Sequence, residues 1–339
     1  MVGTLVAAGV SALLYHLGIG LPAFLIPLQV VRVRKGARHF LVAAAVAFVA
    51  IAGLRLALAG GSVSLRPSEG QFPLVLPAGQ LSGAGTPALV LELSVVLGML
   101  AGLAWIQLPE LMGRPALLPG GRVVRLLVAT AAAGLASVPL ISYLGRNQAF
   151  TAGLGRLFDA AAALLNRLLD PSGAEAGFRG EELAAMTRAV FLRSYLLDYL
   201  LVLTFCWWVG TALGARSLGR RPGITPLARF RPAEALIWPL ILGLALVLLN
   251  LVVPIGPLEL AGWNLLLVML FIYGLAGLGI LRFLLDRLGA PRGMRLLTWL
   301  VLGALAFAPG VNAALAVLVS GLGVSETWIN YRNRERSKA

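Results

Sequence analysis

Apolar runs of about 20 residues recur along the whole chain, and each is long enough to cross a lipid bilayer as an α-helix. Of the 339 residues, 59% are hydrophobic and 12% are charged, whereas soluble domains carry about 25% charge. Strands of a membrane β-barrel alternate apolar and polar residues, and these runs do not. The sequence therefore predicts an all-α, polytopic transmembrane helical bundle with about 8–10 membrane segments.

The first and last segments come in pairs that contain helix-breaking residues, "GIGLP" and "APG". Such breaks are tolerated in membranes where neighbouring protein satisfies the freed backbone groups. Two short hairpins are preferred, and one kinked span at each end is the alternative. The predicted segments cover residues 3–17, 19–31, 39–59, 87–107, 123–143, 191–214, 235–255, 259–284, 295–308 and 311–329.

The distribution of charge predicts the orientation. If the segments alternate, one side of the membrane holds 20 of the 28 Lys and Arg residues and five of the 14 acids. The net charges of the two sides are then +15 and −1. The positive-inside rule makes the basic side cytoplasmic. We expect a multi-pass protein of the bacterial cytoplasmic (inner) membrane with both termini in the cytoplasm.

The predicted organisation is a single transmembrane domain over residues 1–331 and a basic cytoplasmic tail at 332–339. Two long loops, 60–86 and 146–190, are placed outside the cytoplasm. The first is rich in Gly, Pro and Ser, without helical periodicity. The second begins with an amphipathic helix, "AFTAGLGRLFDAAAALLNRLLDP", which lies at the interface or covers a cavity. Residues 180–190 are expected to extend the sixth span outward.

No catalytic or cofactor-binding motif is recognisable in the sequence. It contains two histidines, one cysteine, and no metal-ligand spacing, phosphate-binding loop or dinucleotide fingerprint. The prediction is a non-enzyme with no metal and no cofactor. The basic clusters are explained by topology and contact with the lipid bilayer, so no nucleic-acid role is assigned.

Polar residues inside the spans are the candidate binding residues. Charges at membrane depth are costly, so they usually pair or face an aqueous cavity. Arg55 and Glu92 lie at similar depth in adjacent antiparallel spans and are predicted to form an ion pair. These two belong to a set that falls in the outer half of the bundle and either lines a ligand pocket or serves helix packing: Arg55, Glu92, Asp198, Asn250, Glu259 and Asn264.

Small residues recur at four-residue spacing on the first helix, and small faces allow helices to approach closely. The face either packs within the bundle or docks a partner subunit. The candidate docking residues are Gly3, Ala7, Ala8, Ser11 and Ala12.

Four stretches together carry a family resemblance: "FLIPLQVVRVRKGARHFLVAA" (24–44), "LARFRPAEALIWPLIL" (227–242), "NLLLVMLFIYGLAGLGILRFLLDRLGAP" (264–291) and "GLGVSETWINYRNR" (321–334). They resemble the YybS-like membrane proteins, the family of domain of unknown function 2232. The closing stretch departs from that family's pattern by Glu for Asp at 326 and Asn for Asp at 330. The helical pattern is more weakly similar to the S subunits of energy-coupling-factor vitamin transporters. That resemblance implies capture of a small molecule from outside and docking through the first helix.

Two functions follow as expectations. One is a non-catalytic substrate-capture or transport-type subunit that binds a small or lipid-like ligand from the outer side and works with other membrane subunits. The alternative is a structural or assembly subunit of a larger membrane complex. The sequence does not identify the ligand.

Overall fold

The computed structural model describes most of the chain, and in the described residues all regular structure is helical. The described residues are 1–17, 23–59, 85–107, 121–169, 179–221, 226–308, 310–329 and 331–332. Their α-helices are α1 (Val2–Leu17), α2 (Leu25–Lys35), α3 (Ala37–Ala59), α4 (Gly85–Ile106), α6 (Gly121–Arg146), α7 (Gln148–Leu169), α8 (Gly180–Ser217), α9 (Ile237–Val252), α10 (Gly256–Arg287), α11 (Arg292–Phe307) and α12 (Val311–Ser325). Two short 3₁₀ helices, η1 (Leu227–Arg229) and η2 (Glu234–Leu236), precede α9.

The predicted all-α membrane architecture is confirmed. Five of the described helices are long and apolar enough to cross a bilayer, and they include α3, α8 and α10. Shorter apolar helices cover Val2–Leu17, Glu92–Ile106 and Val311–Ser325. The amphipathic helix after residue 146 is present as α7, and residues 180–190 do extend the sixth span, because α8 is one helix of 38 residues. The predicted loop at 60–86 lies almost wholly outside the described residues.

The second predicted segment differs clearly in its bounds. The sequence places the second segment at 19–31, whereas α2 covers Leu25–Lys35. Pro27 is tolerated because it lies in the first helical turn, where backbone N–H groups have no intrahelical partner. The basic residues at the other end continue the helix because cations are favourable near a helix C-terminus. Gly36, with a φ of 90°, then ends α2.

The chain divides into two compact units. Unit 1 comprises Met1–Phe191 and Asp198–Pro222, and unit 2 comprises Leu192–Leu197 and Gly223–Ala339. The helix α8 therefore contributes residues to both units. The single transmembrane domain expected from the sequence stays a prediction.

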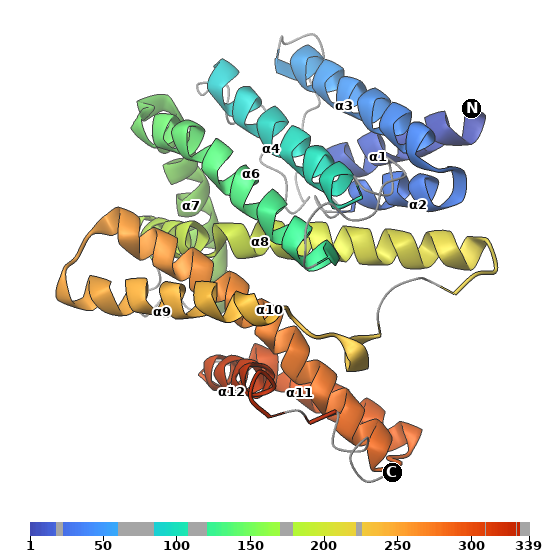
Figure 1. Cartoon of the computed structure of the whole chain (residues 1–339). Helices are drawn as coiled ribbons and strands as arrows, with labels where there is room; N and C mark the ends of the chain where they lie inside the picture. The colour runs from blue at the N-terminus through green and yellow to red at the C-terminus, as the bar shows by residue number, and fades with distance from the viewer. Residues whose placement is uncertain are drawn as a thin grey trace. The chain divides into compact units, whose positions relative to one another are not determined.

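In unit 1, α1 packs on α2 and α3, and α3, α4 and α6 lie in sequence beside one another (Figure 1). Its apolar core includes Phe24, Phe40 and Leu103, none of which is exposed. Glycines allow a close approach between α8 and α2. A Cβ atom at Gly210 would lie 2.5 Å from Cβ of Gln29, and one at Gly214 would lie 2.7 Å from Cβ of Val33.

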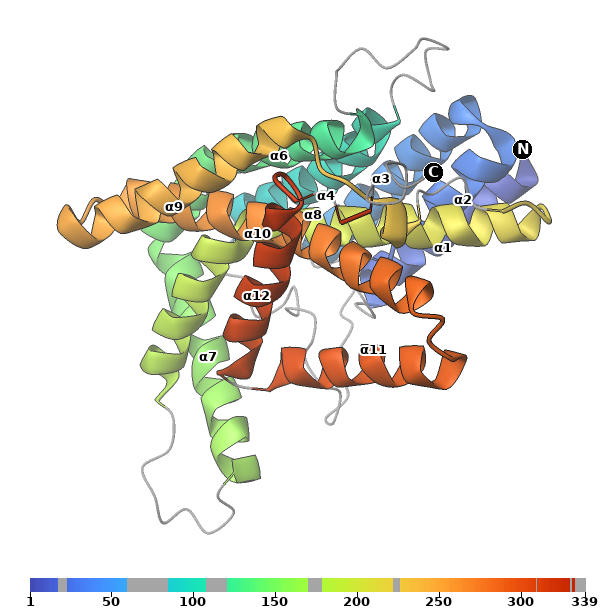
Figure 2. The same cartoon turned by 60° about the horizontal axis from the view of Figure 1, so that its bottom comes forward.

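In unit 2, α10 is the central helix, and it packs against α9 and α12. A Cβ atom at Gly277 would overlap the carbonyl oxygen of Val319, and one at Gly323 would overlap that of Tyr273. Small residues let membrane helices approach to backbone contact, so these two glycines determine the spacing of α10 and α12. Figure 2 shows α11 and α12 running in different directions, and Gly310, with a φ of 79°, immediately precedes α12.

Candidate functional site

The predicted ion pair is confirmed and belongs to a three-residue cluster in unit 1, here called the Glu92 cluster (Tyr15, Arg55 and Glu92). Nη2 of Arg55 lies 2.6 Å from Oε1 of Glu92. The Tyr15 hydroxyl donates a hydrogen bond to the same oxygen. The Arg55 guanidinium also lies 5.6 Å from the centre of the Tyr15 ring, within reach of a cation–π interaction.

Three helices bring the Glu92 cluster together: the end of α1, the end of α3 and the first half of α4. The exposed fractions are 12% for the Arg55 side chain and 30% for that of Glu92, while Tyr15 is 3% exposed. Two opposite charges in a membrane interior lose less free energy when they pair. Tyr15 was not predicted as a member, because an aromatic residue in an apolar helix gives no signal for its partner.

Two buried nitrogen atoms, one in the cluster and one next to it, have no hydrogen-bond partner among the described residues. Nε of Arg55 and Nε2 of His16 are buried and make no hydrogen bond to the described residues. Both side chains contact the Tyr15 ring, since the His16 ring packs edge-on to it at 5.5 Å between centroids. A buried polar group without a partner is costly. Arg55 Nε–H, and His16 Nε2 when it carries the proton, can therefore donate hydrogen bonds to acceptors other than the described residues.

A second polar cluster lies in unit 2. Nε of Arg193 donates to Oε1 of Glu259 at 3.0 Å, and the same guanidinium lies 5.8 Å from the centre of a Trp263 ring. The Asn264 amide is 8% exposed; it accepts a hydrogen bond from the Leu196 N–H and donates to two carbonyl oxygens. Asn264 therefore fastens α8 to α10 by satisfying backbone groups, which is a packing role.

The six predicted binding residues do not form one cluster within either unit. Arg55 and Glu92 pair in unit 1, whereas Glu259 and Asn264 belong to the cluster in unit 2. The Asn250 side chain accepts the Ile255 N–H at 3.0 Å and so caps the turn between α9 and α10. Asp198 is exposed on the part of α8 that belongs to unit 1.

The candidate docking residues of α1 separate into two groups. Ala8 and Ser11 are fully buried and Ala12 is 8% exposed, because this side of α1 packs inside unit 1. The Ser11 hydroxyl donates to the carbonyl oxygen of Phe24 at 2.5 Å. In this arrangement the three residues offer no surface to another chain. Gly3 and Ala7 instead line an open groove between α1 and α2.

A buried amide network that the sequence analysis did not single out joins α2, α4 and α8. Gln107, just past the end of α4, donates to the Gln29 side-chain oxygen at 2.7 Å and to the Leu103 carbonyl at 2.9 Å. Gln29 in turn donates to the Thr211 hydroxyl at 2.9 Å. All the named amide nitrogens are satisfied within the chain, which favours a packing role.

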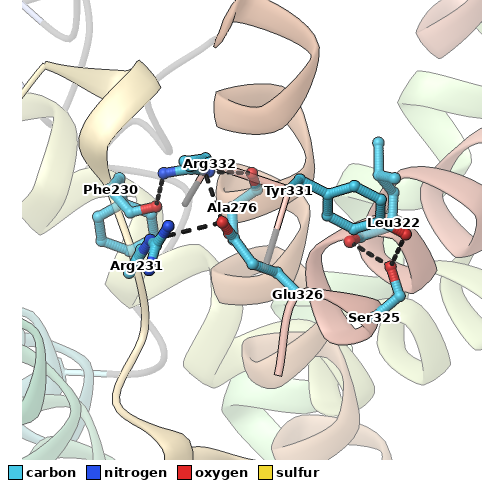
Figure 3. Close-up of polar contacts among 8 residues, drawn as sticks. All are labelled: Phe230, Arg231, Ala276, Leu322, Ser325, Glu326, Tyr331 and Arg332. Carbon is cyan, nitrogen blue, oxygen red and sulfur yellow. Dashed lines mark hydrogen bonds and ion pairs between the residues drawn. The ribbon is translucent and has the colours of Figure 1, made fainter. Parts of the chain in front are cut away.

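The closing stretch of the family resemblance forms a third cluster, in unit 2. Oε1 of Glu326 lies 3.1 Å from Nε of Arg332 and 3.4 Å from Nε of Arg231, and Figure 3 shows its carboxylate between the two guanidinium groups. Arg332 also donates to the carbonyl oxygens of Phe230 at 2.9 Å and Ala276 at 3.2 Å. Arg332 thus ties the segment after α12 to α10 and to the loop before α9. A Cβ atom at Gly279 would overlap the Leu227 carbonyl oxygen, so glycine there lets this loop reach α10.

In this cluster, burial disfavours the charged forms of the side chains, whereas the pairing of opposite charges favours them. The side chains of Glu326 and Arg332 are each 6% exposed. Burial lowers the pKa of Arg332 from its ordinary value, while the nearby Glu326 carboxylate acts in the opposite direction. Loss of either member is unfavourable, because Arg332 would become a buried cation without this carboxylate and Glu326 would keep only the more distant Arg231.

Replacement of Arg332 by glutamine is expected to lower the free energy of unfolding by about 3 kcal/mol, because it leaves the Glu326 carboxylate with the more distant Arg231. Thermal unfolding in detergent measures the effect. The control is Arg282→Gln, since the pair of Arg282 with Asp286 is more than 40% exposed on both sides and is expected to contribute little. Equal melting temperatures for the two variants would contradict this account.

Among the described residues, no group of three or more His, Cys, Asp and Glu side chains is placed to hold a metal ion. Cys206, the single cysteine of the sequence, is buried in the core of unit 1.

Residues 180–324 match the sequence model of a family described as "Predicted membrane protein (DUF2232)". The match includes the stretches at 227–242 and 264–291 that carry the resemblance, but not the stretch at 24–44, and it ends just before Glu326. No curated protein and no solved structure matches the chain. The comparisons and the apolar helices together indicate a membrane protein with several spanning helices.

Proposed function

We propose that this protein is a non-catalytic, transport-type membrane subunit that binds a small or lipid-like molecule at the Glu92 cluster. The observation that carries the proposal is the pair of buried nitrogens, on Arg55 and His16, that have no hydrogen-bond partner among the described residues. A ligand with one or more acceptor oxygens would satisfy them. Capture of such a ligand from the outer side, in a bacterial cytoplasmic membrane, agrees with the predicted topology.

The Glu92 cluster is chemically suited to recognition. Nη2 of Arg55 is already held by Glu92, so the guanidinium is oriented before a ligand arrives, and less free energy is lost in ordering it. The Glu92 side chain keeps 30% of its surface exposed, so the cluster is not sealed inside the core. The resemblance to the S subunits of energy-coupling-factor transporters is part of this proposal and supports the expectation of partner subunits.

A structural or assembly role is the second candidate. It is favoured by unit 2, where the predicted binding residues Asn264 and Asn250 satisfy backbone groups of the chain itself. In that case the Glu92 cluster would also be a packing device, and its unpartnered nitrogens would be satisfied by water.

The test compares the two histidines of the chain. The full-length protein is purified in mild detergent, and co-purifying small molecules are identified by mass spectrometry. We expect His16→Leu to lose a molecule that the wild type retains, because it removes one unpartnered nitrogen without touching the ion pair. His39→Leu is the control, since the His39 ring nitrogen lies 3.0 Å from the Lys35 carbonyl oxygen, at the end of α3 opposite to Arg55.

Both variants must elute as folded monodisperse protein for the comparison to count. Retention of the same molecules by His16→Leu and by the wild type would reject binding at the Glu92 cluster. Absence of any small molecule from the wild type, together with stoichiometric recovery of other membrane subunits, would favour the assembly role.

A further inference from the structure

A groove of about 340 Å³ runs between α1 and α2 in unit 1. Its volume lies within the range of ligand pockets, roughly 300–1,000 Å³. One stripe of α1 and one stripe of α2 form the walls, each at helical spacing. The lining residues are Gly3, Val6, Ala7 and Val10 of α1, and Pro27, Val30, Val31, Arg34 and Lys35 of α2.

The groove is apolar along its length and cationic at one end. Val6 and Val10 on α1 face Pro27, Val30 and Val31 on α2 without any polar side chain among them. From Pro27 to Val31 the aliphatic part of the α2 wall is about 6 Å long, at 1.5 Å per helical residue. This aliphatic wall suits the part of a hydrocarbon chain that lies next to its headgroup.

Arg34 and Lys35 supply the charge at the other end. The groove lining contains no carboxylate, and α1 and α2 contain none either. Both side chains are exposed, and in the described part of the chain neither one has an ion pair. A Cβ atom at Gly3 would lie 2.8 Å from the Lys35 ammonium nitrogen. Glycine at this position therefore leaves room for the Lys35 ammonium at the end of the groove.

We propose that the groove binds one anionic phospholipid, with an acyl chain against the valines and Pro27 and the phosphate on Arg34 and Lys35. The argument is one of complementarity: an apolar trough that ends at two cations matches an aliphatic tail that ends at a negative headgroup. The predicted topology places these cations at the cytoplasmic surface, where anionic lipids attract basic residues. The site is separate from the Glu92 cluster and does not depend on the function proposed there.

The test titrates the purified full-length protein in nonionic detergent with phosphatidylglycerol, and in parallel with phosphatidylcholine, and counts bound lipids by native mass spectrometry. We expect one phosphatidylglycerol to bind more tightly than any phosphatidylcholine. Arg34→Gln with Lys35→Gln should weaken that binding by about 30-fold, the effect of two cations near an anionic headgroup. The matched control is Arg38→Gln with Arg216→Gln, which removes the same charge from exposed residues outside the groove.

Two further arms test the tail and the headgroup separately. Ala7→Phe should fill the groove and weaken binding of phosphatidylglycerol while leaving both cations in place. Glycerol phosphate, a headgroup without tails, should bind much more weakly than the lipid.

Four outcomes would overturn the proposal. One is equal weakening by the control pair, which would make the effect one of net charge. Another is binding of glycerol phosphate as tight as that of the lipid, or unchanged lipid binding by Ala7→Phe, since the groove would then contribute nothing. The last is efficient cross-linking of a photoreactive residue at Val6 to a second polypeptide in native membranes, which would assign the groove to a partner helix.

Discussion

Gly277→Ala is expected to lower the free energy of unfolding by about 3 kcal/mol, at the upper end of the usual cost of overpacking. The reason is that the new Cβ would overlap the Val319 carbonyl oxygen, and a backbone atom cannot move away by a change of side-chain rotamer. The helices α10 and α12 must therefore separate, and the hydrogen bond from the Ser320 hydroxyl to the Leu270 carbonyl, 2.7 Å long, should be lost with their contact. Thermal unfolding of the purified protein in detergent measures the change.

The same helix pair offers a reciprocal variant and a control. Gly323→Ala is expected to behave like Gly277→Ala, since its Cβ would overlap the Tyr273 carbonyl oxygen. Gly321→Ala lies two residues away on α12 with open space around its Cβ, and should stabilise the helix slightly, because alanine is the better helix former. If all three variants melt alike, the close approach of α10 and α12 described above is wrong.

The second large effect is expected at the Glu92 cluster. Arg55→Ala and Glu92→Ala should each cost about 3 kcal/mol of free energy of unfolding, the lower end for a broken buried pair, because Glu92 keeps partial exposure. The double variant should cost clearly less than the sum of the two, because it leaves no uncompensated charge. A double-mutant cycle on thermal stability isolates this coupling.

The pair of Arg193 and Glu259 provides the comparison for that cycle. The Arg193 side chain is 45% exposed, so solvent screens the pair and the coupling there should be small. Additive effects at Arg55 and Glu92 would mean that the two charges are stabilised by water or other groups rather than by each other.

The positions of the helices followed from sequence because lipid imposes a simple rule. In lipid, the backbone N–H and C=O groups of a segment must be hydrogen-bonded within that segment, so a long apolar run forms a helix. The predicted sixth span and its extension correspond to the single helix α8, and the amphipathic segment after residue 146 corresponds to α7. The bounds of α2 were less predictable, because a proline early in a helix and basic residues late in it are both compatible with helix.

The candidate site was predictable only in part. Arg55 and Glu92 could be paired because adjacent antiparallel spans place them at one depth, and charges in lipid need partners. Tyr15 could not be assigned to them, since the apolar pattern of the first helix does not show which of its faces meets α3 and α4. Asn264 is similar: the sequence places it near one end of a span, but two of its three backbone partners, the Leu196 N–H and the Leu192 carbonyl, lie on α8.

The amino-acid order alone was enough for an all-α membrane protein and for one of its ion pairs, because hydrophobic run length and the cost of charge in lipid are local properties of the chain. Tertiary packing decided the rest. It buried Ala8 and Ser11 inside unit 1 and left Gly3 and Ala7 beside the cations of α2. It also joined Glu326 to Arg231 and Arg332. Such contacts depend on which faces of distant helices meet. The helical periodicity of a segment does not show which other helix its apolar face contacts.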